Sequence, residues 1–406
     1  MRTEAVRLYG KEDLRLESFE LPEIKDDEIL FEVIVDSMCM STYKIAIQGA
    51  EHKKIPNDIN ENPTIMGHEI AGNIVKLGKK WEGKFDLTKK YAIQPNIPQT
   101  EEYPGYALRY CGGNATYIIL PSMMMEDGCL IPFSNKSYFE GALTEPLSCV
   151  LAGFKSNYHK IDQSHRHEYG IKKGGNVLIL GGTGPMGLLA VDCAINNINT
   201  PKNVVITDID EEKLTRASKL YPGNEHTQVH FVNTKDVEDQ ASLLMEVVAG
   251  KYDDVFVYVP VEQLVTVGDA VLNTDGCLNI FAGPSDKEFS ARVNFYDVHY
   301  RNTHFVGVSG GTVEDYIESL KMIEEGAVDV SKVVTHVLGL EDTGRVIVDQ
   351  VKIGGGKKLV YPHCKIPFTS LEELMTSDQP LAEILSKNDG LWNAEAENYV
   401  LEKLKK

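Results

Sequence analysis

The sequence predicts an α/β protein in which a β-rich N-terminal domain is followed by a doubly wound domain with a parallel sheet. Residues 28–36, which read Glu-Ile-Leu-Phe-Glu-Val-Ile-Val-Asp, are rich in β-branched side chains and typical of a strand, as are residues 115–120 after a Gly-Gly turn. From about Gly174 onward, short and wholly apolar runs alternate with intervals of helical length. Such runs are typical of parallel strands that helices cover on both faces.

The parallel strands are expected at residues 176–180, 203–207, 229–232, 254–259, 277–281 and 304–308. They are followed by an expected helix at 313–325, strand at 333–338, helix at 341–352 and strand at 357–361. This last piece is too small to hold a core alone, so we expect it to pack back on the first domain. The expected domains are therefore 1–158 (β-rich), 159–308 (doubly wound) and 309–406 (return to the first domain plus a C-terminal extension).

The charge balance restricts the classes of partner. The chain of 406 residues has 41 Lys and Arg against 60 Asp and Glu, a formal net charge of −19. This disfavours nucleic-acid and anionic-membrane binding, because both normally need a basic face. No stretch approaches the roughly 18 apolar residues of a membrane span, and the N-terminus lacks a secretory signal, so a cytoplasmic location is expected. The seven cysteines lack a C-x2-C pair, which fits reduced thiols or single metal ligands better than disulfides.

A glycine turn lies between an expected strand and an expected helix. Gly182, Gly184 and Gly187 have G-x-G-x-x-G spacing. The first glycine permits a tight turn, the second lets a pyrophosphate approach the backbone, and the third lets helix and strand pack closely. We therefore predict a Rossmann-type dinucleotide site. Its expected cofactor-binding residues are Gly182, Thr183, Gly184, Pro185, Met186 and Gly187.

Asp208 completes this dinucleotide pattern at the end of the next expected strand, where a carboxylate accepts hydrogen bonds from ribose hydroxyls. Capping of the following helix is the alternative role. A carboxylate at this position repels a 2′-phosphate, and no arginine follows directly, so NAD(H) is favoured over NADP(H). Lys213 and Arg216, one helical turn further on, leave NADP(H) as the alternative.

Three separate stretches contain residue types that bind zinc: Cys39, the pair His68 and Glu69, and Glu145. A thiolate, an imidazole and a carboxylate suit a catalytic zinc, which takes about three protein ligands and leaves one position open. Taken singly, each such cysteine or histidine is more often a core residue than a ligand. Spacing alone therefore leaves both interpretations open.

Taken together, these segments resemble the medium-chain zinc-dependent dehydrogenases. The resemblance rests on Cys39 to Lys44, the Gly67-His68-Glu69 block continuing to Gly72 and Gly78, the Glu145-Pro146-Leu147 triplet, and the glycine turn with Asp208. It covers about residues 1–361 and implies a GroES-like β domain and a Rossmann domain, with the active site in the cleft between them. The Glu-Pro-Leu triplet is similar to the polyol dehydrogenase branch.

The resemblance implies that Cys39, His68 and Glu69 are the zinc ligands and that Glu145 is an alternating or water-held ligand. Which of the two carboxylates binds the metal directly stays open. The zinc would polarise the substrate oxygen, and the nicotinamide would give or take the hydride.

Further catalytic roles also follow only from the resemblance. Besides Glu145, Ser41 is similar to the family's proton-relay hydroxyl, and Lys44 stands where a relay base or a ribose contact is found. A turn-capping hydroxyl and a solvated lysine are the alternatives. Thr42 departs from the family, which usually has an aspartate at that position.

No second metal site is expected. Many relatives carry four closely spaced cysteines for a structural zinc, but the corresponding loop, residues 96–113, contains only Cys111. We therefore expect one catalytic zinc and no structural zinc. His159, His165 and His167 lie in a polar stretch and are interpreted as solvated loop residues.

The resemblance implies hydride transfer between NAD(P)(H) and a polyol or ketose. A phosphorylated pair, L-sorbose 1-phosphate and glucitol 6-phosphate, is the particular expectation. Residues 48–62 contain His52, Lys53 and Lys54, a basic cluster that would suit a phosphate, although a solvated loop is the alternative. Dehydrogenases of the sorbitol, threonine or galactitol-phosphate type are alternatives of the same class, and a non-catalytic nucleotide sensor is one of another class.

The final segment, residues 362–406, begins after the fold looks complete. An apolar stripe at helical spacing runs through Trp392, Ala396, Tyr399, Val400 and Leu404. A tail docked on its own chain and a contact between subunits are the two interpretations. A homo-oligomer is expected from the resemblance.

Overall fold

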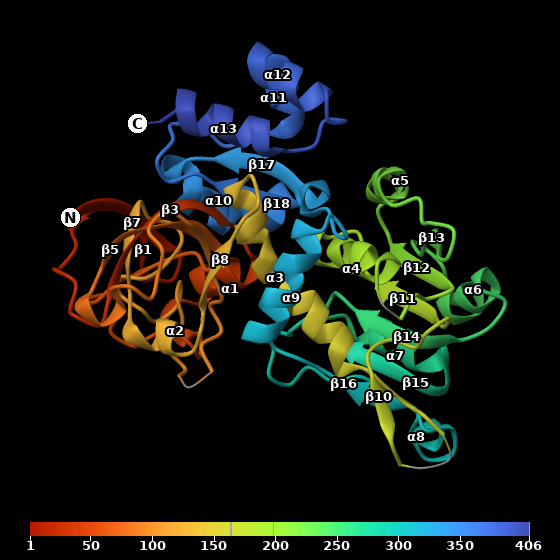
Figure 1. The fold of residues 1–406 in the computed structure, drawn as a ribbon. Coiled ribbons are helices and arrows are strands. Elements are labelled where there is room, and N and C mark those ends of the chain that lie inside the picture. Colours follow the sequence, from red (N-terminus) through yellow and green to blue (C-terminus); the bar gives the residue numbers. More distant parts are fainter. Residues whose placement is uncertain (99, 163–164, 198, 406) are drawn as a thin grey trace. The chain divides into compact units, whose positions relative to one another are not determined.

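The computed structural model describes residues 1–98, 100–162, 165–197 and 199–405 (Figure 1). The chain forms two compact units. The first comprises Met1–Pro146, Thr312–Glu324 and Val330–Lys406, and the second comprises Leu147–Gly311 and Glu325–Asp329. Each unit mixes helices and strands, which confirms the α/β class. The domain boundaries expected after residues 158 and 308 stay predictions.

The first unit is built around a large, mainly antiparallel sheet with strand order β19-β17-β18-β3-β5-β6-β8, in which β7 also pairs with β3. Its strands are β3 (Ile29–Ser37), β5 (Ile70–Leu77), β6 (Lys90–Ile93), β7 (Tyr117–Leu120), β8 (Leu130–Phe133), β17 (Val334–Leu338), β18 (Lys357–Val360) and β19 (Thr369–Ser370). A smaller sheet has the order β2-β1-β4, with β1 (Arg2–Gly10), β2 (Asp13–Glu20) and β4 (Thr64–Ile65). Strand β3 lies in the middle of the large sheet, and its side chains Phe31, Val33 and Val35 are fully buried. The strand expected at residues 28–36 is thus confirmed to within one residue.

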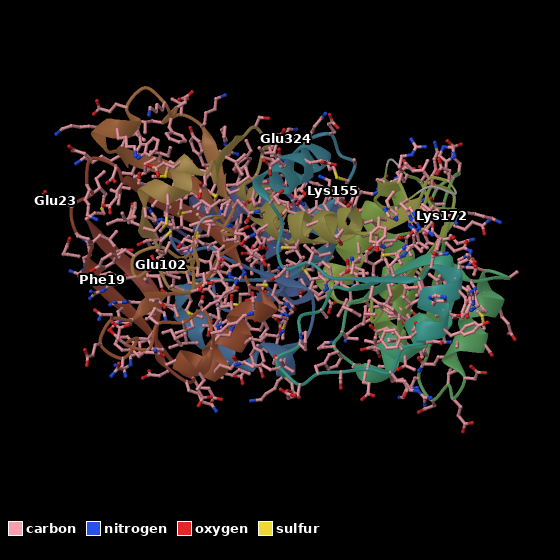
Figure 2. All side chains as sticks on the ribbon, turned by 90° about the horizontal axis from the view of Figure 1, so that it is seen from below. Phe19, Glu23, Glu102, Lys155, Lys172 and Glu324 are labelled. Atoms are coloured by element: carbon pink, nitrogen blue, oxygen red, sulfur yellow. The ribbon has the colours of Figure 1, made fainter. Side chains whose placement is uncertain are left out.

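Helices and the returning segment complete the first unit. Its helices before the extension are α1 (Met40–Gln48), α2 (Ser122–Glu126), the first part of α3 (Tyr138–Ser156), α9 (Val313–Glu324) and α10 (Leu340–Ile353). Short 3-10 helices occur at Gly49–Glu51, Lys79–Trp81 and Val330–Val333. Glu324, labelled in Figure 2 on α9, accepts hydrogen bonds of 2.9 Å from the backbone N–H and the hydroxyl of Ser134. The returning segment is therefore held on the loop after β8.

The second unit contains a six-stranded parallel sheet with order β13-β12-β11-β14-β15-β16. Its strands are β11 (Asn176–Leu180), β12 (Asn203–Asp208), β13 (Gln228–Asn233), β14 (Tyr252–Val257), β15 (Leu272–Ile280) and β16 (His304–Val306). In chain order this is 3-2-1-4-5-6, the doubly wound arrangement, and all six expected strands are present. A short antiparallel pair, β9 (Tyr158–Lys160) and β10 (His167–Tyr169), belongs to the same unit.

The helices of the second unit are α4 (Pro185–Ile195), α5 (Glu211–Leu220), α6 (Gln240–Val247), α7 (Glu262–Ala270) and α8 (Phe295–Arg301). Helices α4 and α5 contact β12, and α7 contacts β14 and β15. Among the described residues, no helix of either unit has the length and apolar character needed to cross a bilayer.

His159 corrects one expectation from the sequence. It is only 7% exposed, and its Nε2 lies 3.0 Å from Asp254 Oδ1. Burial opposes protonation, but the hydrogen bond to Asp254 raises the pKa of His159. Lys172, labelled in Figure 2, donates its backbone N–H to Asp254 over 2.8 Å and its Nζ to Asp253 over 2.7 Å. His159 is therefore part of a buried polar network at the start of β14 and not a solvated loop residue, whereas His165 and His167 are exposed.

The C-terminal extension packs on the first unit of its own chain (Figure 1). It contains α11 (Leu371–Ser377), α12 (Gln379–Ser386) and α13 (Ala394–Lys403), and β19 extends the large sheet by pairing with β17. The side chains of Trp392, Ala396 and Val400 are fully buried. Tyr399 and Leu404 of the same stripe are only partly buried. Most of the apolar stripe is thus covered within the chain, as the docked-tail interpretation requires.

Candidate metal centre

The ends of two neighbouring strands bring the expected metal ligands together. Cys39 follows β3 and precedes α1, whereas His68 and Glu69 directly precede β5. Because β3 and β5 are antiparallel and Asp36 lies opposite Ile70, the end of one strand meets the start of the other. One candidate ligand atom each of Cys39, His68 and Glu69 lies within 4.8 Å of the others.

The hydroxyl of Ser41 lies between two of these ligand atoms. Its Oγ donates to the Sγ of Cys39 over 3.0 Å and is 3.2 Å from His68 Nε2. Cys39 Sγ and His68 Nε2 therefore face the same small space. Lys44 follows one turn later on α1 and is partly exposed.

The charged groups at this centre are buried. Glu69 is 0% exposed, and its Oε1 accepts an ion-paired hydrogen bond from Nζ of Lys357, which is 2% exposed. Burial opposes the charge of Lys357, but Glu69 and Cys39 hold its pKa above the ordinary value. Lys357 is the first residue of β18. Because β18 pairs with β3, the register of the sheet places the Lys357 ammonium group beside Glu69.

Glu145 approaches the same centre from α3. Burial, followed by the negative charge of Glu69, raises the pKa of Glu145 to about 8, while His68 lowers it. Pro146 follows directly and lacks the N–H that would continue the helical hydrogen bonding. Glu69 has one oxygen held by Lys357, while its Oε2 has no hydrogen-bond partner among the described groups. Both carboxylates therefore remain candidates for the direct ligand.

Asp36 holds the backbone of Glu69 in place and was not identified from the sequence as part of the site. Its Oδ1 accepts from the backbone N–H of Glu69 over 2.9 Å, and its Oδ2 accepts from Asn114 over 2.6 Å. A side chain at Gly67 or Gly113 would clash with this carboxylate, because an added Cβ would lie 2.4 or 2.1 Å from its oxygens. Neither Asp36 nor Lys357 stands in a recognisable motif, so only the fold identifies them.

The donor set fits zinc. Sulfur, imidazole nitrogen and carboxylate oxygen are the ligands that zinc takes in proteins, and three of them within this distance leave a position for substrate or water. Burial lowers the pKa of His68, which keeps the imidazole neutral as a ligand must be. In most zinc sites the second ring nitrogen of a ligand histidine has a hydrogen-bond partner. Here Nδ1 of His68 is buried without one in the described structure, and so is the hydroxyl of Thr42.

The described part of the chain contains no second group of three possible metal ligands. Cys111, in the loop expected to lack a structural zinc, is buried with its Sγ 3.9 Å from Met124 Sδ. Gln99 of that loop lies outside the described residues.

The glycine turn connects β11 to α4 as expected. Its positive φ of 70° lies at Gly181, one residue before the expected position. A Cβ at Gly182 or Gly187 would clash with the packed turn, whereas a Cβ at Gly184 would meet nothing within 4 Å. Gly184 is the N-cap residue of α4 and Pro185 occupies its first turn, so free N–H groups begin beside open space.

Asp208 ends β12 and is tied to this turn. Its Oδ2 accepts from the hydroxyl of Thr183, and its Oδ1 accepts from the backbone N–H of Ile209 over 2.8 Å. Helix α5 is instead capped by Asp210, which excludes the alternative role of Asp208 as its N-cap. Asp210 also forms a 3.2 Å ion pair with Lys213.

Comparisons with known proteins agree with this arrangement. Residues 185–325 match the profile of the family described as zinc-binding dehydrogenase. The chain is 46% identical over 401 residues to L-sorbose 1-phosphate reductase of Klebsiella pneumoniae, covering 98% of this chain and 97% of that protein. It is 41% identical over 413 residues to mannitol-1-phosphate 5-dehydrogenase of Aliivibrio fischeri, covering 99% and 98%. A protein from Sinorhizobium meliloti solved with NADP has a TM-score of 0.71 at 21% identity, over 89% of this chain and 100% of that one. The expected GroES-like and Rossmann folds are thus confirmed.

The glycine turn yields a matched pair of substitutions. In Gly187→Ala, the added Cβ would lie 2.4 Å from the carbonyl oxygen of Gly182, and such overpacking costs about 1–3 kcal/mol. Gly184→Ala should fold with wild-type stability and only weaken NADH binding, because its Cβ enters the space where a pyrophosphate would lie. Thermal unfolding and NADH fluorescence titration measure the two effects. Equal stability of the two variants would contradict the close packing of Gly187 against Gly182.

The buried ion pair yields a second prediction. Lys357→Met leaves Glu69 charged and unpaired, which should lower the free energy of unfolding of the chelator-treated protein by about 3–5 kcal/mol. The double variant Lys357→Met/Glu69→Gln should recover much of that loss. Lys358→Met is the matched control, since Lys358 is equally buried but bonds only backbone carbonyls, and it should cost less. Equal losses in the two single variants would contradict the prediction.

Proposed function

The chain belongs to the family of zinc-binding dehydrogenases, and from that premise we propose that it interconverts a ketose phosphate and a polyol phosphate with NAD(H). The chain is therefore an oxidoreductase. The observation that carries the proposal is the cluster of possible ligand atoms of the partly buried Cys39 and the buried His68 and Glu69, with Glu145 beside it. The same cluster argues against a non-catalytic nucleotide sensor, which would have no use for buried zinc ligands. A homo-oligomer and a cytoplasmic location stay predictions.

Cys39, His68 and one of the two buried carboxylates would hold the metal. When bound, zinc would act as a Lewis acid that polarises the substrate oxygen. The chain's own residues supply charge balance and a proton path. Lys357 compensates the charge of Glu69, and the Ser41 hydroxyl, in contact with both Cys39 and His68, is placed to hold or pass a proton beside the substrate oxygen. Lys44, one turn further along α1, is the proposed next group in that path.

NAD(H) is the proposed cofactor. Thr183 and Asp208 are joined by a hydrogen bond across the glycine turn, so a carboxylate occupies the edge of the turn. A negative charge there disfavours the 2′-phosphate of NADP(H). Lys213, one of the two basic residues nearby, is already paired with Asp210.

A half-buried lysine supports a phosphorylated substrate. The Nζ of Lys54 lies 4.2 Å from the ring centre of Tyr103 and 5.4 Å from that of Tyr106. The Tyr106 ring is in turn 5.2 Å from the ring of His68, so one aromatic side chain separates this ammonium group from the candidate metal ligand.

The electrostatics of Lys54 favour an anion. Burial and the charge of Lys53 lower the pKa of Lys54, so an anionic ligand would be stabilised there. Lys54 has no ion-pair partner within the described residues. L-Sorbose 1-phosphate and glucitol 6-phosphate are the proposed substrate pair, in line with the names of the two relatives that act on sugar phosphates.

A substrate panel tests the proposed function. With NADH, purified protein should reduce L-sorbose 1-phosphate faster than L-sorbose, and NADPH should support a lower rate. Treatment with a chelator should abolish the activity, and added zinc should restore it. Metal analysis should find one zinc per chain, and less in Cys39→Ala. Full activity after complete removal of zinc would refute the proposal.

Substitution of Lys54 tests the phosphate contact. Loss of one charge-assisted contact corresponds to about 1.5–3 kcal/mol. Lys54→Met should therefore raise KM for L-sorbose 1-phosphate by about 10–100-fold, with little change in kcat or in the kinetics with L-sorbose. Lys89→Met, at an exposed lysine on the turn before β6, controls for the loss of one positive charge. An equal effect on both sugars would contradict the assignment of the phosphate to Lys54.

A further inference from the structure

The C-terminal extension supplies a buried carboxylate to the helix that carries Glu145. Glu397, on α13, is 0% exposed. Its Oε1 accepts the backbone N–H of Phe139 over 2.8 Å, and its Oε2 accepts the backbone N–H of Tyr138. Both donors lie in the first turn of α3. A residue some 258 positions away in sequence thus caps this helix.

The first N–H groups of a helix lack partners within the helix, and a carboxylate placed there is favoured by both hydrogen bonding and the helix dipole. A residue just before the helix usually provides this cap. Here Ser137 precedes α3, but its hydroxyl donates to Glu140 and does not accept from the backbone. The cap of α3 therefore depends on the extension.

A chain of hydrogen bonds fixes the Glu397 side chain. The hydroxyl of Tyr361 donates to its Oε1 over 3.1 Å, and Trp392 Nε1 donates to the Tyr361 oxygen over 2.9 Å. Tyr361 and Trp392 are themselves fully buried. The carboxylate can therefore hold α3 in one position.

The capped segment leads directly to Glu145. Glu145 lies seven positions after Tyr138. This is about two helical turns and returns to the same face of α3. Pro146 then interrupts the backbone hydrogen bonding immediately after Glu145. The position of Glu145 is thus set from the N-terminal side of α3. Two further bonds hold this part of the helix, from Tyr138 Oη to Asn73 and from Tyr316 Oη to the Gly141 carbonyl, each about 3 Å long.

We propose that Glu397 is a positioning residue for the active site: by capping α3 it sets where Glu145 stands at the metal centre. This inference rests on the proposed function, in which Cys39 and His68 hold zinc beside Glu145. Its consequence is that the C-terminal extension is part of the catalytic apparatus and not merely a docked tail.

The burial of Glu397 makes its hydrogen bonds to α3 specific. Burial raises the pKa of Glu397 to about 7, against the lowering effect of the Tyr138 and Phe139 N–H groups, the Tyr361 hydroxyl and the charge of Lys90. No ion pair of Glu397 is found in the part of the chain that the structure describes. A buried carboxylate without a paired cation is costly unless its hydrogen bonds are made, and an apolar residue at this position would leave the N–H groups of Tyr138 and Phe139 unpaired. The contact between Glu397 and the start of α3 is therefore specific.

The kinetics of Glu397→Gln and of a control variant test this proposal. Glu397→Gln keeps the size of the side chain but replaces one of the two acceptor oxygens with a donor. It should lower kcat on the order of tenfold, with a smaller change in KM, and should weaken zinc binding measured by chelator competition. Val400→Ala is the matched control, because Val400 is fully buried on the same helix but its apolar side chain cannot accept a hydrogen bond from α3. It should lower the midpoint of thermal unfolding and leave kcat and zinc affinity unchanged.

A double-mutant cycle separates this proposal from the proposed function. If Glu397 acts through Glu145, adding Glu397→Gln to Glu145→Gln should produce no further loss of kcat. The inference would be overturned if the two substitutions lowered kcat by independent factors that multiply in the double variant. It would also be overturned if Glu397→Gln changed only the thermal stability. Normal activity of Glu145→Gln alone would instead overturn the role of Glu145 in the proposed function. Should Glu397→Gln fail to fold, Tyr361→Phe removes one donor to Glu397 and should show a smaller loss with the same non-additivity.

Discussion

The candidate metal centre depends on the buried ion pair between Lys357 and Glu69. Glu69 is fully buried, its neighbour Glu145 is 9% exposed, and the Cys39 thiol lies beside them. Acidic groups packed together in this way repel one another and lose hydration, so they need a cation inside the same pocket. Lys357 supplies it from β18, whose Leu359 lies opposite Ser37 of β3. The chain therefore has to return to the first unit after its parallel sheet, because the balancing charge is encoded in the returning segment.

Strand register places the other groups. Cys39 and the His68-Glu69 pair meet because β3 and β5 are antiparallel with Asp36 opposite Ile70, and the Asp36 carboxylate then accepts the backbone N–H of Glu69. A shift of one residue in that register would turn the alternate side chains of the strand to the opposite face of the sheet. The close packing of Gly67 and Gly113 against Asp36 leaves little room for such a shift. The geometry of the ligands is therefore a property of the sheet and not of the loops alone.

Much of this arrangement could be predicted from the sequence, and the rest could not for identifiable reasons. Apolar runs with clear boundaries, such as residues 176–180, identified the parallel strands, and the candidate ligands Cys39 and His68 stand in motifs of known spacing. Lys357 and Asp36 stand in ordinary strand sequences, and only long-range pairing gives them a role. His159 was misinterpreted because its polar neighbours suggested solvent, whereas its partner Asp254 lies about 95 residues further along the chain.

The same reasoning applies to the last segment of the chain. The apolar stripe of α13 predicted that the extension packs against something, but Glu397 lies among those positions as an acid and gave no signal of its own. If the extension served only to cover the sheet, an apolar residue at position 397 would pack there without the desolvation penalty of a carboxylate. The carboxylate is instead matched by two backbone N–H groups at the start of α3 and by the hydroxyl of Tyr361. Lys357 and Glu397, both encoded after the parallel sheet, thus act on the two buried glutamates of the centre by different means. Lys357 balances the charge of Glu69, and Glu397 fixes the helix that carries Glu145.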